Sequence, residues 1–225
     1  MPRRLITAAI ALLITVVLAS PATAGLETSK DQQIADESVL TSSDVPSGFE
    51  QVPPDDDDTT PASKVCRTVR RGRDALDDAP NAEVEFRTRG DASGSALIGN
   101  KVAVFETTKA ATRALRAYAD DDTGRCFEQN YRKIFESELA GADGASVEVT
   151  SSRYAPDGGD AAVGYEVEIE ASAEGDSQTF YVDLAVYRVG RTIDAFAYFN
   201  SGSQPPSDDV AAMTDAGLGR LEDAL

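Results

Sequence analysis

The sequence of 225 residues contains no histidine, and this absence removes several kinds of site at once. A serine–histidine–aspartate triad, a cysteine–histidine pair and a histidine-bound metal all require the imidazole ring. No lysine stands three residues after a serine either, so a Ser-x-x-Lys motif is also missing. Catalysis by paired carboxylates stays open, because it needs only aspartate and glutamate.

Basic residues are scarce relative to acidic ones. The chain has 21 lysines and arginines against 39 aspartates and glutamates, which gives a formal net charge of −18. Nucleic acids and anionic membranes are themselves polyanions, so this charge disfavours both as partners. Solubility outside the cell, or in a salty medium, is preferred over steering of a charged substrate as the explanation.

The first 24 residues are typical of a secretory signal peptide. A short basic start, residues 1–4, precedes an apolar run over residues 5–19 and a group of small residues with an Ala-x-Ala pattern. Cleavage is expected between Ala24 and Gly25. A permanent membrane anchor is the alternative, but the run is shorter than the ~20 residues that a bilayer requires. We therefore expect a secreted protein, extracellular or associated with the cell wall, with no stable membrane insertion after cleavage.

Cys66 and Cys126 are the only cysteines. Export would place them in an oxidising compartment, where an even pair forms a disulfide. A metal site would need further soft ligands, and a redox pair would need Cys-x-x-Cys spacing. Since the chain offers neither, the sequence predicts one structural disulfide and no metal or cofactor.

Residues 25–62 are expected to form a flexible arm that is acidic and rich in proline. The run Asp55–Asp58 lacks the spaced acids, glycine and distal glutamate of a calcium loop, so it is interpreted as a solvated linker. Within the arm, Leu40, Val45 and Phe49 are candidates for docking on the folded domain.

Residues 63–225 are expected to form a single α+β domain, an antiparallel sheet of about six strands packed with about four helices. The clearest signal is the alternation of apolar residues with Glu166, Glu168 and Glu170, which predicts a strand with one wet face. The strands are expected over 83–88, 96–106, 146–153, 163–171, 179–189 and 192–199. The helices are expected over 63–78, 107–118, 125–139 and 207–221.

The first of these helices is basic in an otherwise acidic protein. Arg67, Arg70, Arg71 and Arg73 lie on it. An anion site is one interpretation. Pairing with acidic neighbours in the same segment is the other, and it is preferred because arginines readily bind carboxylates.

The strands over 179–189 and 192–199 have two apolar faces, which indicates helices on both sides of the sheet or an open aromatic groove. Helical cover is the simpler interpretation, because buried aromatic residues normally belong to a core. An open groove would suit a small amphipathic or cationic ligand. Its candidate binding residues are Tyr181, Asp183, Tyr187, Asp194, Phe196 and Tyr198.

The stretch Leu40–Phe49, with its Asp-Val-Pro-x-Gly-Phe ending, and the strand–helix–cysteine–helix order before a β-meander resemble a known family. They are similar to actinobacterial extracytoplasmic sensor-like domains, among them the outer domain of PknH-type serine/threonine kinases and related exported lipoproteins. The resemblance implies a ligand-binding or sensing module on a mixed sheet with a cleft. The chain departs from it by having one cysteine pair, no lipid-acceptor cysteine and no kinase, so kinase signalling is not implied.

Two function classes follow. A secreted, non-catalytic binding or sensor-like module of the cell envelope is favoured, with a small-molecule or envelope-derived ligand and an unknown oligomeric state. A secreted carboxylate-dependent hydrolase is the alternative, and it would need two acids facing each other at roughly 5–10 Å in a pocket. A structural envelope protein without a ligand cleft is the third interpretation.

Overall fold

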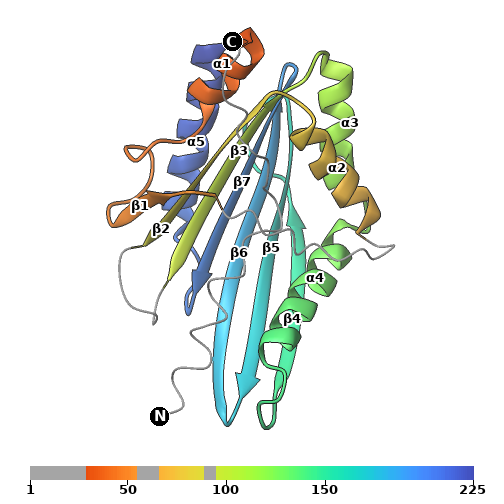
Figure 1. The fold of residues 1–225 in the computed structure, drawn as a ribbon, viewed down its shortest axis with the longest axis vertical. Helices are drawn as coiled ribbons and strands as arrows, with labels where there is room; N and C mark the ends of the chain where they lie inside the picture. Colours follow the sequence, from red (N-terminus) through yellow and green to blue (C-terminus); the bar gives the residue numbers. More distant parts are fainter. Residues whose placement is uncertain (1–28, 55–65, 89–94) are drawn as a thin grey trace.

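The computed structural model describes residues 29–54, 66–88 and 95–225, which form one sheet with helices on both faces (Figure 1). The strands are β1 Phe49–Val52, β2 Asn81–Thr88, β3 Ala96–Val104, β4 Ser146–Tyr154, β5 Ala161–Ala173, β6 Asp176–Val189 and β7 Thr192–Ser201. The helices are α1 Lys30–Ser38, α2 Arg67–Asp77, α3 Thr108–Tyr118, α4 Thr123–Glu138 and α5 Ser207–Ala224.

The sheet is antiparallel throughout, in the order β1-β2-β3-β7-β6-β5-β4. Strands β4 to β7 follow one another as a meander, which confirms the arrangement that the sequence predicted. Pairing of β3 with β7 then joins the first three strands to the same sheet. The α+β class, the antiparallel sheet and the disulfide between Cys66 and Cys126 are confirmed.

One face of the sheet packs against α2, α3 and α4 around the larger hydrophobic core. Strand β5 contributes alternate residues to this core, among them Tyr165, Val167 and Ile169, as its pattern predicted. Helices α2 and α3 approach closely because Gly72 has no side chain. A β-carbon at this position would lie 2.8 Å from the ring of Tyr118, too close for a normal contact.

The opposite face is covered only in part. Helices α1 and α5 lie over the half of the sheet that contains β2, β3 and β7 (Figure 1). Met213 and Leu221 of α5 are buried there against Phe86 and Ile98. The glutamates of β5 stay exposed on the same face. The sheet therefore has a covered half and an open half on this side.

The structure corrects the predicted number of elements. The described residues contain seven strands and five helices instead of six and four, and both additions, α1 and β1, lie within the segment predicted as a flexible arm. Helix α1 begins after Ser29, whose hydroxyl accepts a hydrogen bond from the Gln32 amide at 3.1 Å, and it buries Ile34 and Ala35. Predicted docking of Leu40, Val45 and Phe49 on the domain is confirmed.

Several predictions fall outside the described residues. These are the signal peptide, its cleavage between Ala24 and Gly25, and the acidic run 55–58. None of the helices in the described ranges is long and apolar enough to cross a membrane. At the other end of the chain, α5 begins at Ser207, where the sequence predicted a helix to start, with Pro206 as its N-cap.

The disulfide joins the start of α2 to α4 across 60 positions of the sequence. Replacing both cysteines by serine is expected to lower the free energy of unfolding by about 4 kcal/mol, because the cross-link restricts the unfolded chain. Urea unfolding of the variant and of the oxidised protein measures this difference. The reduced protein is the matched control and should unfold like the variant. A variant as stable as the oxidised protein would contradict the prediction.

Candidate functional site

A groove of about 460 Å³ lies where the covered half of the sheet meets the open half. Its floor is the open face of β5 and β6, with Glu166, Glu168, Tyr181 and Asp183. The first turns of α5 form one wall, and the end of β4 with the loop after it forms the other. The groove exists because α5 crosses the sheet over β7 and stops short of β4 and β5.

Tyr154 and Asp183 form a polar contact on the floor. The Tyr154 hydroxyl donates a hydrogen bond to Asp183 Oδ1 at 2.5 Å. The Tyr154 ring reaches this position by lying across Gly164, where any side chain would collide with it. Burial raises the pKa of Asp183; the hydrogen bond from Tyr154 lowers it, and the charge of the neighbouring Glu166 raises it further.

Tyr187 connects the floor to the helical wall. It is buried and packs against Leu218 of α5, and it shares the groove lining with Thr214 of the same helix. Burial raises the pKa of the Tyr187 hydroxyl to about 12, so it stays protonated at neutral pH. Tyr181 differs, since it is half-buried and lines the groove beside Glu168, its neighbour on β5.

The charged side chains that line the groove are all acidic. They are Asp157, Glu166, Glu168, Asp183 and Asp215. Three tyrosines, at positions 154, 181 and 187, share the lining with these carboxylates. Carboxylates attract a cation through charge, and the faces of aromatic rings attract it through their quadrupole. The lining therefore favours a ligand with a positive group and an apolar part.

Three of the six predicted binding residues lie in this groove, namely Tyr181, Asp183 and Tyr187. The other three lie under α5, which corrects their predicted placement in one open groove. Phe196 and Tyr198 are each 4% exposed and belong to the core below the helix. Both interpretations of the two apolar faces are thus partly right, because α5 covers one end of the aromatic surface and leaves the other open.

Asp194 is the third covered residue, and it is 3% exposed. Its Oδ1 accepts a hydrogen bond from Asn100 Nδ2 at 2.6 Å, and Asn100 Oδ1 accepts one from the Leu40 amide at 3.0 Å. Gly217 of α5 lies directly above, where a β-carbon would be only 3.0 Å from Asp194 Oδ2. Burial raises the pKa of Asp194 to about 7, although the hydrogen bond from Asn100 lowers it.

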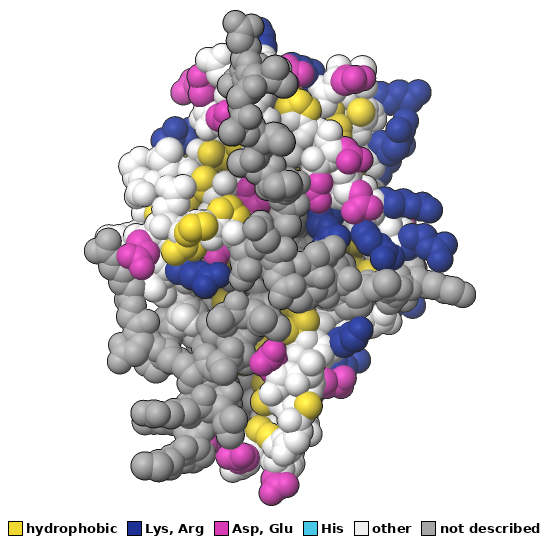
Figure 2. All heavy atoms as spheres, viewed as in Figure 1, with side chains coloured by type: hydrophobic (Ala, Val, Ile, Leu, Met, Phe, Trp, Pro, Cys, Tyr) yellow, Lys and Arg dark blue, Asp and Glu magenta, His cyan; other side chains and the backbone are white. Residues whose placement is uncertain are grey.

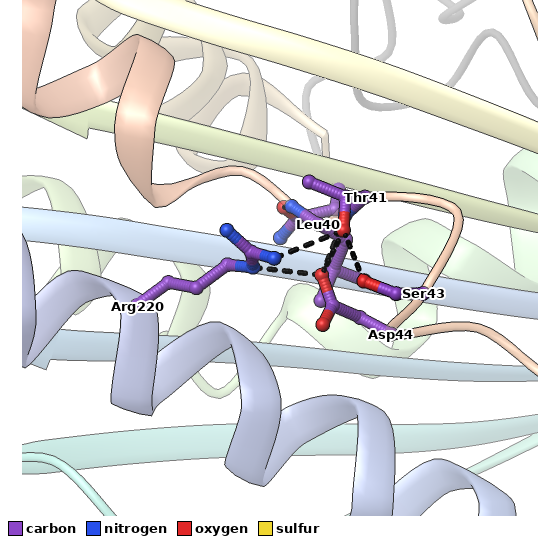
Figure 3. A network of polar contacts seen from close by, with 6 residues as sticks. Leu40, Thr41, Ser43, Asp44 and Arg220 are labelled. Carbon is purple, nitrogen blue, oxygen red and sulfur yellow. Dashed lines mark hydrogen bonds and ion pairs between the residues drawn. The ribbon is translucent and has the colours of Figure 1, made fainter.

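A second polar network fixes α5 to the loop after α1 (Figure 3). Asp44 Oδ2 accepts hydrogen bonds from the Thr41 amide and hydroxyl, each at 2.7 Å, and from Arg220 Nε at 2.7 Å. Arg220 Nη2 also donates to the Thr41 hydroxyl at 2.9 Å. These contacts hold the pKa of Asp44 below its usual value, although burial opposes them. The motif-like stretch of the sequence therefore positions the helix that forms the groove wall.

Several lining residues were not predicted as site residues. Tyr154, Asp157 and Asp215 gave no signal, because their place depends on how β4 and α5 pack. Glu166 and Glu168 were recognised as one wet face of a strand, but nothing in that pattern showed that the face borders a helix. Among the described residues, no three acidic or cysteine side chains group closely enough to hold a metal ion.

No protein-family model and no curated protein matches the sequence. The fold is similar to the extracellular domain of PknH from Mycobacterium tuberculosis, with 12% identity and a TM-score of 0.53 over 85% of this chain and 96% of that one. LpqN, involved in cell envelope biogenesis of the same organism, matches with 11% identity and a TM-score of 0.29 over 80% and 78% of the two chains. The first likeness confirms the predicted resemblance at the level of the fold.

Asp194 is expected to make the stability of the protein depend on pH below neutrality. Its pKa is about 7 in the folded state and near 3.8 when unfolded, so the folded protein binds this proton more tightly. The stabilisation is complete below the unfolded value and is lost as the pH rises through about 7. Asp194→Asn keeps the acceptor for Asn100 and should remove this loss.

Urea unfolding at a series of pH values from acid to neutral compares the two proteins. The difference in free energy of unfolding between wild type and Asp194→Asn should change by about 4 kcal/mol across that range. Asp223→Asn, at an exposed position in the last turn of α5, is the matched control and should keep the pH dependence of the wild type. A parallel pair of curves for wild type and Asp194→Asn would contradict the prediction.

Proposed function

We propose that this protein is a secreted, non-catalytic binding module of the cell envelope that takes a small cationic, amphipathic ligand in the groove beside α5. The observation that carries the proposal is the composition of the groove lining, five carboxylates and three tyrosines with no basic side chain. A positive group would lie against Glu166, Glu168 and Asp183. An apolar part would contact Tyr181 and the α5 wall at Val210 and Ala211.

The proposed location outside the cell is supported by the leader-like first 24 residues and by the likeness in fold to an extracellular domain. The buried disulfide is consistent with an oxidising compartment. The groove itself argues for a binding protein over a purely structural one, because a protein without a ligand has no need of a cleft lined by like charges.

A carboxylate-dependent hydrolase is the second candidate. Glu166 and Asp183 are paired across neighbouring strands, and the raised pKa of Asp183 is a property that a general acid requires. Two features favour binding instead. The Tyr154 hydroxyl already donates a hydrogen bond to Asp183 Oδ1. Glu166 and Asp183 also lie side by side on neighbouring strands, whereas the two acids of such a hydrolase face each other from opposite sides of the substrate.

Paired probes of opposite charge test the proposal. The chain beginning at Gly25 is titrated with short-chain alkyltrimethylammonium salts and with alkyl sulfates of the same length, below their micelle concentrations. Calorimetry and thermal shift should detect the cationic series only, because the lining carboxylates repel sulfate. Equal binding of both series, or binding of the sulfates alone, would overturn the proposal, and turnover of glycan or ester probes would favour the hydrolase.

Substitutions in the lining should weaken binding without unfolding the protein. Tyr181→Ala removes a half-exposed ring and is expected to reduce affinity for the ammonium probe about tenfold. Glu168→Gln removes one carboxylate from the groove, and Glu136→Gln on the far side of the sheet is its matched control. Affinity that falls equally in both glutamine variants would show that only the overall charge attracts the probe.

A further inference from the structure

Three arginines of α2, Arg67, Arg70 and Arg71, do not form ion pairs with the acidic residues of their own segment, in contrast to the preferred interpretation of the sequence. Within the described ranges, no ion pair involves Arg67, Arg70 or Arg71. Asp77, one of their expected partners, instead contacts the buried Lys101, which also lies 3.4 Å from Glu83. The outer face of α2 therefore keeps its positive charge.

Helix α3 extends this face. Lys109, Arg113 and Arg116 are spaced by four and three residues, so they lie on one side of the helix, and all three are exposed. The residues of α3 that pack on the core lie on its other side. The helix contains no acidic residue.

These residues together make one continuous positive surface, although the protein has a net charge of −18. We call it the basic strip, and it consists of Arg67, Arg70, Arg71, Lys109, Arg113 and Arg116. The close contact at Gly72 holds α2 against α3, so the two outer faces adjoin. Figure 2 shows lysine and arginine side chains gathered along this edge of the molecule. Two exposed carboxylates lie on the outer face of α2, Asp74 and, at the C-cap, Asp78.

The form of the strip indicates a spread-out partner. Its side chains stand on two adjoining helices, and none of them lines the groove beside α5 or the two smaller pockets near Arg125 and Phe127. Leu225, at the end of α5, is the only large hydrophobic side chain exposed among the described residues. Contact through the strip is therefore electrostatic, without insertion of apolar groups.

We propose that the basic strip is a docking surface for a lipid bilayer that contains anionic phospholipids. Such a surface presents many phosphate groups in one plane, which matches cations distributed over two adjoining helices. The overall negative charge does not prevent this contact, because salt screens charges beyond about 8 Å and the acidic groove belongs to the other face of the sheet. The proposal does not depend on the ligand proposed for the groove. The groove would stay open to solvent when the strip lies on a membrane, because the two are on opposite faces of the sheet.

Vesicle sedimentation tests the proposal with the chain beginning at Gly25. Vesicles that contain phosphatidylglycerol should bind the protein at low salt and release it at high salt, and phosphatidylcholine vesicles should not bind it. Each basic residue near an anionic surface contributes about fivefold to binding. The triple variant Arg67→Gln, Arg71→Gln, Arg113→Gln should therefore bind about 100-fold more weakly.

A second triple variant controls for net charge. It carries Ala140→Glu, Ala145→Glu and Ala212→Glu, at three exposed positions off the strip. These substitutions lower the net charge by three, as the three arginine-to-glutamine substitutions do. This variant should bind almost as well as wild type, and Tyr181→Ala should bind vesicles normally even if it loses the groove ligand. Circular dichroism and thermal melting should show that all the variants fold.

Three results would overturn the proposal. They are equal binding to both kinds of vesicle, equal loss of binding in the two triple variants, and binding of soluble polyphosphate with no binding of vesicles. The last result would assign the strip to a soluble anionic polymer instead of a membrane.

Discussion

The attachment of α5 to the sheet is the constraint on which the groove depends. A polar contact and a close approach set its position: Arg220 binds Asp44 on one side, and Gly217 lies over the buried Asp194 on the other. Between them, Met213 and Leu221 fill the core above β3 and β7. A helix held at these points covers one half of the sheet face, and its edge becomes a wall for the other half. The groove thus exists because α5 covers only part of this sheet face.

The groove and the basic strip have opposite charge and lie on opposite faces of the sheet. The groove is lined by carboxylates and tyrosines, whereas the strip on α2 and α3 consists of six cations. The net charge in the composition conceals this separation, because it averages over the whole surface. A protein of this kind can present opposite electrostatic potentials to a ligand on one side and to an extended surface on the other.

Strong local patterns made part of the fold predictable. The alternation along β5 identified its buried and wet faces. The disulfide was predictable because a chain with two cysteines can form only one bond between them. Helix α1 was missed because Ile34 and Ala35 are the only apolar residues on its buried face, which it completes with Ser38. Strand β1 was missed because it has only four residues and pairs with a single neighbour. In the site, Asp183 and Asp194 looked equivalent in sequence, since each stands among aromatic residues on a strand. Only the packing of α5 places one in the groove and the other beneath the helix.

A chain without histidine would be expected to respond little to protons near neutrality, yet burial raises the pKa of two carboxyls, Glu83 and Asp194, to about 7. Asp194 is the one that lies in the core under α5. This carboxyl lies directly under the helix that forms the groove wall, so its charge and the seating of that helix are thermodynamically linked. Linkage is reciprocal. A ligand whose binding raised the pKa of Asp194 would therefore bind more tightly once Asp194 is protonated, and by the same factor.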